Sequence, residues 1–207
     1  MDRESRFWDR IARRYARRPV ADEASYRKKL EITRGLFRPG MEVLEFGCGS
    51  GATAIAHAPH ARHIQAIDIS RAMLDIARGK AAAAGVTNIT FERAGIDDYA
   101  VADGSYDIVL GLSILHLLAD RDAAIAKVHR LLKPGGFFVT STTCLGDSMR
   151  WMKALAPIGR AVGLMPLVKV FTAKQLEASL TGAGFAIEQN WQPGKGKAVF
   201  IVARKPG

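Results

Sequence analysis

A short apolar run followed by glycines at every second position constrains the fold of this chain most. It reads Val43-Leu44-Glu45-Phe46-Gly47-Cys48-Gly49-Ser50-Gly51, and the stretch from Ala52 to Ala58 that follows it has helical character. A strand that passes through a glycine-rich turn into a helix places bare backbone and a helix N-terminus beside a ligand. The run therefore predicts a βαβ unit whose turn holds a ligand.

Strands and helices are predicted to alternate along the rest of the chain. Apolar runs predict further strands at 63–68, 89–92, 106–110, 137–141, 185–191 and 198–204. Helical patterns cover 7–15, 23–37, 71–84, 120–132 and 173–180. Ser70 is a candidate N-cap for the helix 71–84, and Gly85 closes it. This alternation predicts an α/β protein with a parallel sheet that is covered by helices on both faces.

The glycine turn by itself fits two cofactor chemistries. Gly47-x-Gly49-x-x-Ala52 satisfies the dinucleotide-binding fingerprint. Glu45-x-Gly47-x-Gly49-x-Gly51 has instead the acid and three glycines of methyltransferases, and Glu45 stands where a nicotinamide-binding loop usually has an apolar residue. Asp68, at the end of the second strand, is placed to accept hydrogen bonds from two ribose hydroxyls, which suits either cofactor.

Two more motifs lie farther along the chain. An acid interrupts the apolar strand Tyr106-Asp107-Ile108-Val109-Leu110, and Leu131-Leu132-Lys133-Pro134-Gly135-Gly136 precedes the fifth strand. With these motifs the chain resembles the class I S-adenosylmethionine-dependent methyltransferase family from about Phe7 to Lys205. The opening Phe7-Trp8-Asp9-x-Ile11-Ala12-x-x-Tyr15 and the ending Ala183-Gly184-Phe185 are similar to small bacterial members, including the ubiquinone/menaquinone C-methylase-like and lipid N-methylase-like groups.

The resemblance implies a fold and a domain plan. The fold is a Rossmann-like doubly wound sheet, mostly parallel with an antiparallel last strand, plus N-terminal helices and a lid insertion. Residues 1–207 would form one methyltransferase domain. Within it lie an N-terminal helical cap at 1–38, a cofactor-binding core at 39–145, the lid insertion at 146–172 and a last helix and strand pair at 173–207.

The resemblance also implies S-adenosyl-L-methionine as cofactor and S-adenosyl-L-homocysteine as product. By similarity, the glycines pass under the amino-acid portion of the cofactor, Glu45 organises the loop and meets the amino group, and Asp68 holds the ribose. The implied cofactor contacts are Glu45, Gly47, Cys48, Gly49, Gly51, Asp68, Ile69, Met73, Ile96, Asp97 and Leu112. Gly95 stands where the family usually has an acid for the adenine amino group, so Asp97 or packing against Ile96 is expected to replace that contact.

The reaction would be an in-line displacement at a methyl carbon, for which alignment in a dry site supplies most of the rate. Trp8, Tyr15, Ser113 and Trp151 are the candidate substrate-pocket residues. His116 is the candidate general base if the acceptor must lose a proton; the alternative is that it packs or caps the next helix. The expected acceptor is small and hydrophobic or lipid-like.

Basic charge is concentrated in two regions. The whole chain has a net charge of +10. Residues 1–40 carry twelve Lys and Arg against six acids, and residues 148–176 carry five cations and no acid. The apolar, Met-rich stretch from Trp151 to Phe171 is either a lid that also contacts an anionic membrane or a segment that packs on the core or on a dimer partner. Without a signal-like segment or a long apolar run, and with two cysteines only, we expect a cytoplasmic protein, peripheral at the inner membrane surface.

Two other functions remain alternatives: an NAD-type oxidoreductase and a cofactor-binding protein without activity. His57, His60 and His63 are spaced three apart, but Pro59 lies between them and no further ligand completes a set, so no metal is expected. The basic regions lack interleaved aromatics, which argues against a nucleic-acid substrate.

Overall fold

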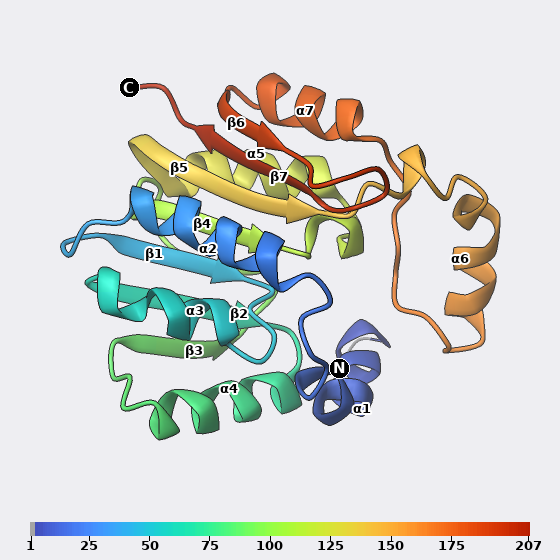
Figure 1. Cartoon of the computed structure of the whole chain (residues 1–207), viewed down its shortest axis with the longest axis horizontal. Helices are drawn as coiled ribbons and strands as arrows, with labels where there is room; N and C mark the ends of the chain where they lie inside the picture. Colours follow the sequence, from blue (N-terminus) through green and yellow to red (C-terminus); the bar gives the residue numbers. More distant parts are fainter. Residues whose placement is uncertain (1–2) are drawn as a thin grey trace. The chain divides into compact units, whose positions relative to one another are not determined.

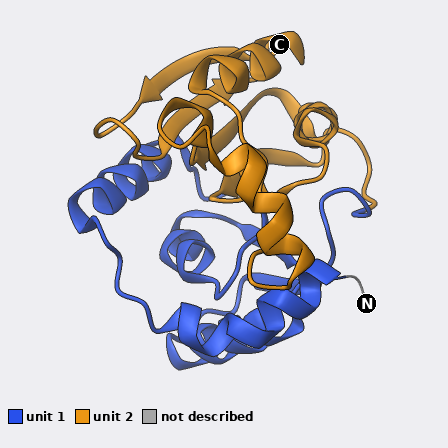
Figure 2. Cartoon of the chain, turned by 90° about the vertical axis from the view of Figure 1, so that its right-hand side faces the viewer, with its two compact units in different colours: residues 1–99 blue, residues 100–207 orange. Residues whose placement is uncertain are grey.

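A computed structural model describes residues 3–207, and the chain divides into two compact units, residues 1–99 and 100–207 (Figure 2). Seven strands occur among the described residues, and each unit has its own set of paired strands.

The first unit consists of two N-terminal helices followed by βαβ units (Figure 1). In chain order its elements are α1 Arg3–Ala16, α2 Glu23–Leu36, β1 Glu42–Phe46, α3 Ala52–His57, η1 Ala58–His60, β2 His63–Asp68, α4 Arg71–Ala83 and β3 Ile89–Arg93. The strands lie in the order β3-β2-β1, and both pairings are parallel. Val43, Leu44 and Phe46 of β1 are buried, as expected for a parallel strand that is covered on both faces.

The second unit carries the antiparallel end of the fold. Its elements are β4 Tyr106–Leu112, η2 Leu115–Leu117, α5 Arg121–Leu131, β5 Leu132–Thr142, η3 Leu145–Asp147, α6 Met152–Ala161, α7 Ala173–Gly182, β6 Ala186–Trp191 and β7 Val199–Arg204. The strand order is β4-β5-β7-β6; β4 and β5 are parallel, and β7 is antiparallel to both of its neighbours. The predicted fold class is confirmed, including the antiparallel last strand.

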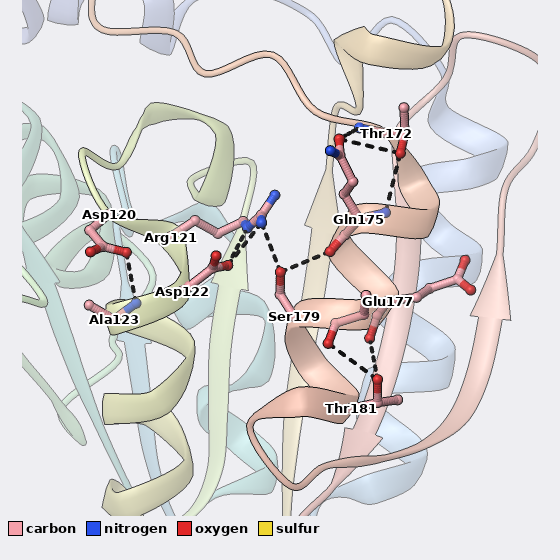
Figure 3. Close-up of polar contacts among 10 residues, drawn as sticks. Asp120, Arg121, Asp122, Ala123, Thr172, Gln175, Glu177, Ser179 and Thr181 are labelled. Atoms are coloured by element: carbon pink, nitrogen blue, oxygen red, sulfur yellow. Dashed lines mark hydrogen bonds and ion pairs between the residues drawn. The ribbon is translucent and has the colours of Figure 1, made fainter.

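Helix boundaries follow side-chain caps. Ser70 accepts a hydrogen bond from the amide of Met73 and so caps α4, as predicted. Asp120 caps α5 in the same way, and Thr172 forms a capping box with Gln175 at the start of α7 (Figure 3). Each cap satisfies amide donors that have no partner within the helix.

Strand β5 is longer than predicted. The sequence predicted Lys133-Pro134-Gly135-Gly136 as the end of a helix and placed the strand at 137–141, but β5 begins at Leu132. The amide of Gly135 donates to the carbonyl of Lys205, and the amide of Lys205 donates to the carbonyl of Gly136. These bonds to a segment about seventy positions away extend the strand pairing through a sequence that is rich in turn formers.

Candidate functional site

The glycine turn leaves β1 as a tight, left-handed path. Gly47, Gly49 and Gly51 have φ values of 65°, 52° and 76°. This is a region that L-residues with a side chain rarely adopt. The amide of Cys48 donates to the carbonyl of Ile67 on β2, and the amide of Gly51 donates to the carbonyl of Cys48. The turn is therefore fixed to the sheet on one side and opens α3 on the other.

Asp68 ties this turn to the start of α4. Its Oδ2 accepts from the amide of Gly49 at 2.8 Å, and its Oδ1 accepts from the amide of Ser70 at 2.8 Å. Burial raises the pKa of Asp68, and these two amides act against that rise. The amide of Ile69 also bonds to this carboxylate. Since a carboxylate has about four acceptor positions, at least one is left for a ligand hydroxyl.

Glu45 is a buried acid at the centre of the unit, with 3% of its surface exposed. Its Oε2 has no hydrogen-bond partner within residues 3–207. Burial, and then the charge of Asp68, raise the pKa of Glu45 to about 8, although the amide of Ala54 lowers it. An unpartnered buried carboxylate oxygen beside a second acid is a position that favours a positively charged ligand group.

The loops after β2 and β3 lie together. A side chain on Gly95 would meet Ile69 Cγ2 at 3.6 Å, and the Arg93 guanidinium donates to the carbonyl of Ile69. Ile69 is half-buried, Ile96 is buried, and Asp97 is exposed. Their contacts with adenine stay predictions, and so does that of Met73, which is buried in the core with 2% of its surface exposed.

Cys48 and the histidines add no further chemistry to the turn. Burial raises the pKa of the Cys48 thiol, which favours the unreactive neutral form. His57 is fully buried, its ring stacks on that of Phe37 at a centroid distance of 4.8 Å, and burial lowers its pKa to about 4. In residues 3–207, His, Cys, Asp and Glu side chains form no group of three that would hold a metal ion.

Asp9 is a site residue to which the sequence assigned no role. Its Oδ1 accepts from the Ser70 hydroxyl at 2.7 Å and from the amide of Ala72 at 3.0 Å. Through these bonds α1 packs on the N-terminus of α4, two residues after Asp68. Burial acts to raise the pKa of Asp9, but these bonds and the charge of Arg93 outweigh it and lower the pKa.

We expect Asp9→Ala to destabilise the protein by about 1–2 kcal/mol, because it removes an acceptor from a hydroxyl and a helix amide. It should also weaken cofactor binding, since the turn that carries Asp68 loses its brace. Urea unfolding and calorimetry measure the two effects. Asp9→Asn keeps one acceptor oxygen and is the matched control; equal behaviour of the two variants would contradict a bracing role.

The aromatic candidates in α1 are partly exposed. Phe7 and Trp8 meet edge to face at 5.5 Å, and Trp8 meets Tyr15 in the same way at 5.8 Å. Tyr15 exposes 43% of its surface. These rings form a row along α1, and their role in a substrate pocket stays a prediction.

The other four candidates belong to the second unit: Leu112 is the last residue of β4, Ser113 and His116 follow it, and Trp151 lies after β5. Ser113 has a φ of 59°, a left-handed value for a residue other than glycine, and its amide donates to the carbonyl of Ser141 at 2.7 Å. Burial lowers the pKa of His116 to about 4, and in the described part of the chain its Nδ1 has no hydrogen-bond partner. Trp151, by contrast, is 58% exposed.

Two of the motifs that supported the resemblance have a structural role. The Lys133 ammonium contacts Asp107 Oδ2 at 2.8 Å, which joins the beginnings of β4 and β5. The acid inside the apolar strand is therefore paired with the lysine of the Lys-Pro-Gly-Gly motif. These residues brace the second unit, and neither was among the predicted site residues.

Comparisons with known proteins agree with this geometry. Residues 43–136 match the family model for a methyltransferase domain. The ubiquinone biosynthesis O-methyltransferase of Vibrio parahaemolyticus is 34% identical over 114 residues, which are 55% of this chain and 47% of that protein. The 27-O-demethylrifamycin SV methyltransferase of Amycolatopsis mediterranei is 32% identical over 153 residues, 73% of this chain and 56% of that protein.

A solved structure, that of the [4+2]-cyclase SpnF, has the same fold, with a TM-score of 0.74 at 19% identity; the match covers 91% of this chain and 83% of that one. The aligned segments span about half the length of the two curated relatives. The cofactor of the matched family is S-adenosylmethionine, and Glu45 with its unpartnered oxygen fits the positively charged amino group of that molecule. The domain at residues 43–136 thus belongs to the S-adenosylmethionine-dependent methyltransferases, as the sequence motifs predicted.

Proposed function

We propose that this chain transfers a methyl group from S-adenosylmethionine to a small, hydrophobic or lipid-like acceptor. The observation that carries the proposal is the buried, unpartnered Oε2 of Glu45, beside a glycine turn that Asp68 holds in place. S-adenosylmethionine supplies a methyl carbon on a positively charged sulfur. Glu45 would bind the positively charged amino group, and the carboxylate of Asp68 would accept from a ribose hydroxyl.

The remaining cofactor contacts are proposed as the sequence implied them. Gly47, Cys48, Gly49 and Gly51 would line the amino-acid portion with backbone, and Ile69, Met73, Ile96, Asp97 and Leu112 would surround the adenine and ribose. Trp8, Tyr15, Ser113 and Trp151 would line the acceptor pocket, and residues 146–172 would form its lid. Together these groups would orient the acceptor and exclude water, which is most of what an in-line displacement requires.

The names of the two relatives support the acceptor class. One acts in ubiquinone biosynthesis and the other on demethylrifamycin SV. The fold by itself does not specify the reaction, since a [4+2]-cyclase shares it. Binding without methyl transfer and NAD-type redox chemistry are therefore the alternatives that an experiment must separate.

Calorimetry with S-adenosylmethionine, S-adenosylhomocysteine and NAD tests the cofactor, and we expect the first two to bind and NAD to fail. A labelled-methyl assay against lipid, quinone and polar fractions of a cell extract then tests transfer. Label in an apolar fraction supports the proposed acceptor, and label in the polar fraction alone contradicts it. Cofactor binding without label in any fraction would leave a binding protein.

His116 is proposed as the general base. Burial lowers its pKa to about 4, so the imidazole is neutral above pH 5, and it is a weaker base than an ordinary histidine. We expect His116→Gln to lower kcat by about 100-fold with little change in cofactor affinity. The wild-type rate should show no ionisation near pH 6.5. A loss of cofactor affinity in parallel with kcat would instead indicate that His116 only packs.

A further inference from the structure

Helix α6 presents a stripe of exposed apolar side chains, which we call the α6 stripe. It consists of Leu155 and Ile158 in the helix and of Trp151 and Val162, which adjoin its two ends. Their spacing of four, three and four residues puts all four on one side of the helix axis. Their exposed fractions are 58%, 50%, 60% and 63%. Leu164, just after the helix, is 76% exposed and continues the apolar surface. Large apolar side chains gathered in this way mark a surface that contacts another apolar phase.

The other sides of α6 differ in character. Ala156 is buried, which shows that a different side of the helix faces the protein. Arg150 and Lys153 are exposed, and the whole stretch 148–176 has five cations and no acid. The segment is thus apolar along one side, and all of its charged side chains are cations. That combination is typical of helices that lie in the headgroup region of an anionic bilayer.

The ends of this segment are held together. The amide of Gly146 donates to the carbonyl of Phe171 at 2.8 Å, and Asp147 Oδ2 accepts from the amide of Ala173 at 2.8 Å. The Arg121 guanidinium stacks on the Phe171 ring at 4.3 Å. It also donates to the Ser179 hydroxyl, as Figure 3 shows. Residues 148–170 therefore form a loop of the second unit whose two ends are joined by these contacts. Figure 1 shows α6 standing apart from the strands of that unit.

We propose that the α6 stripe docks this protein on an anionic lipid surface. The apolar side chains would enter the headgroup boundary, with Trp151 at the depth that its ring prefers, and the cations would meet lipid phosphates. A second copy of the chain is a poorer occupant, because each copy has a net charge of +10 and would bring the same acid-free segment to the contact. This inference does not depend on methyl transfer.

Sedimentation with vesicles tests the proposal, using neutral phosphatidylcholine and the same lipid with 30% phosphatidylglycerol (a chosen composition, about the anionic content that attracts basic segments). We expect binding to the anionic vesicles, weakened by salt, and little binding to the neutral ones. The uncharged variant Leu155→Asn/Ile158→Asn should lower partitioning at least about tenfold, because two partly exposed apolar side chains lose their burial in lipid. Val101→Asn is the matched control, since Val101 is also exposed, at 38%, but lies outside α6.

Tryptophan fluorescence locates the contact. Wild-type emission should shift to the blue on anionic vesicles, and the shift should be mostly lost in Trp151→Phe, which still binds. Equal binding to both vesicle types, no shift, or equal loss in Val101→Asn would overturn the proposal. So would a dimer that the α6 double variant dissolves, which would assign the stripe to a second copy. Cofactor calorimetry on the same samples keeps this outcome separate from that of the proposed function.

Discussion

Replacing Glu45 by glutamine should abolish most cofactor binding. It should also remove the loss of folding stability that Glu45 causes in the free protein as the pH rises. The variant keeps the size of the side chain but lacks the negative charge that would meet the cationic end of S-adenosylmethionine. We expect the Kd to rise by about 100-fold or more, as for the loss of one partner of a buried charge pair. Calorimetric titration with S-adenosylmethionine measures this loss.

The pH dependence of stability follows from the raised pKa of Glu45. An ordinary Glu pKa of 4.5 rises to about 8 in the folded protein. The folded state therefore holds the proton more tightly than the unfolded state does. The stability from this proton is fully present below about pH 4.5 and is lost as the pH rises through 8. From pH 5 to pH 9, wild type should lose on the order of 4 kcal/mol relative to Glu45→Gln.

Cofactor binding should also release a proton. Near pH 6.5 the free protein holds Glu45 protonated, and a cation placed beside Oε2 would favour the carboxylate. Calorimetry in two buffers of different ionisation enthalpy detects the proton, and the Gln variant should release none from this position. Glu42→Gln is the matched control in the same strand, since Glu42 is partly exposed and lies near Arg62. If Glu42→Gln and Glu45→Gln bind equally well, Glu45 has no special role.

The sequence predicted the strand and helix pattern well because most elements carry their own signals. Ser70, for example, was predicted as an N-cap from its place before the helix 71–84. In the structure its side chain accepts a hydrogen bond from the amide of Met73. Strand β5 was predicted too short, because its first residues are held by a partner near the end of the chain. Local turn preference could not reveal that pairing. Helix α6 was not predicted either, since Pro157 lies inside it.

In the first unit, the residues of the candidate site could be named from the sequence, but the contacts that brace them could not. The glycines, Glu45 and Asp68 could be named because strand, turn and helix follow one another within a short stretch. Asp9 carries no local signal, since its partners Ser70 and Ala72 are more than sixty positions away. The pairing of Asp107 with Lys133 was hidden for the same reason.

Two glycines of the turn differ in what surrounds them, although both have left-handed backbones. A Cβ added to Gly51 would lie 2.8 Å from Ala77 Cβ on α4 and 3.2 Å from the Phe91 ring. A Cβ added to Gly49 would meet nothing within 4 Å. Gly51 is therefore required by packing as well as by its φ, whereas Gly49 faces open space that the cofactor is proposed to use.

Alanine substitutions at these two glycines should rank in opposite order for the loss of stability and for the loss of cofactor affinity. Gly51→Ala should cost about 2–4 kcal/mol in urea unfolding, from the left-handed φ and from overlap with Ala77. Gly49→Ala should cost about 1–2 kcal/mol from the φ alone, yet weaken cofactor binding more than Gly51→Ala does in the folded fraction.

A double-mutant cycle isolates the overlap at Gly51. Ala77→Gly removes the nearest Cβ, so Gly51→Ala/Ala77→Gly should be less unstable than the sum of the two single changes by about 1–2 kcal/mol. The φ cost stays in the double variant, because changing α4 does not alter the backbone of the turn. Strictly additive free energies of unfolding would mean that the added Cβ at position 51 does not overlap with Ala77 of α4. In that case Gly51 is required by its left-handed backbone alone.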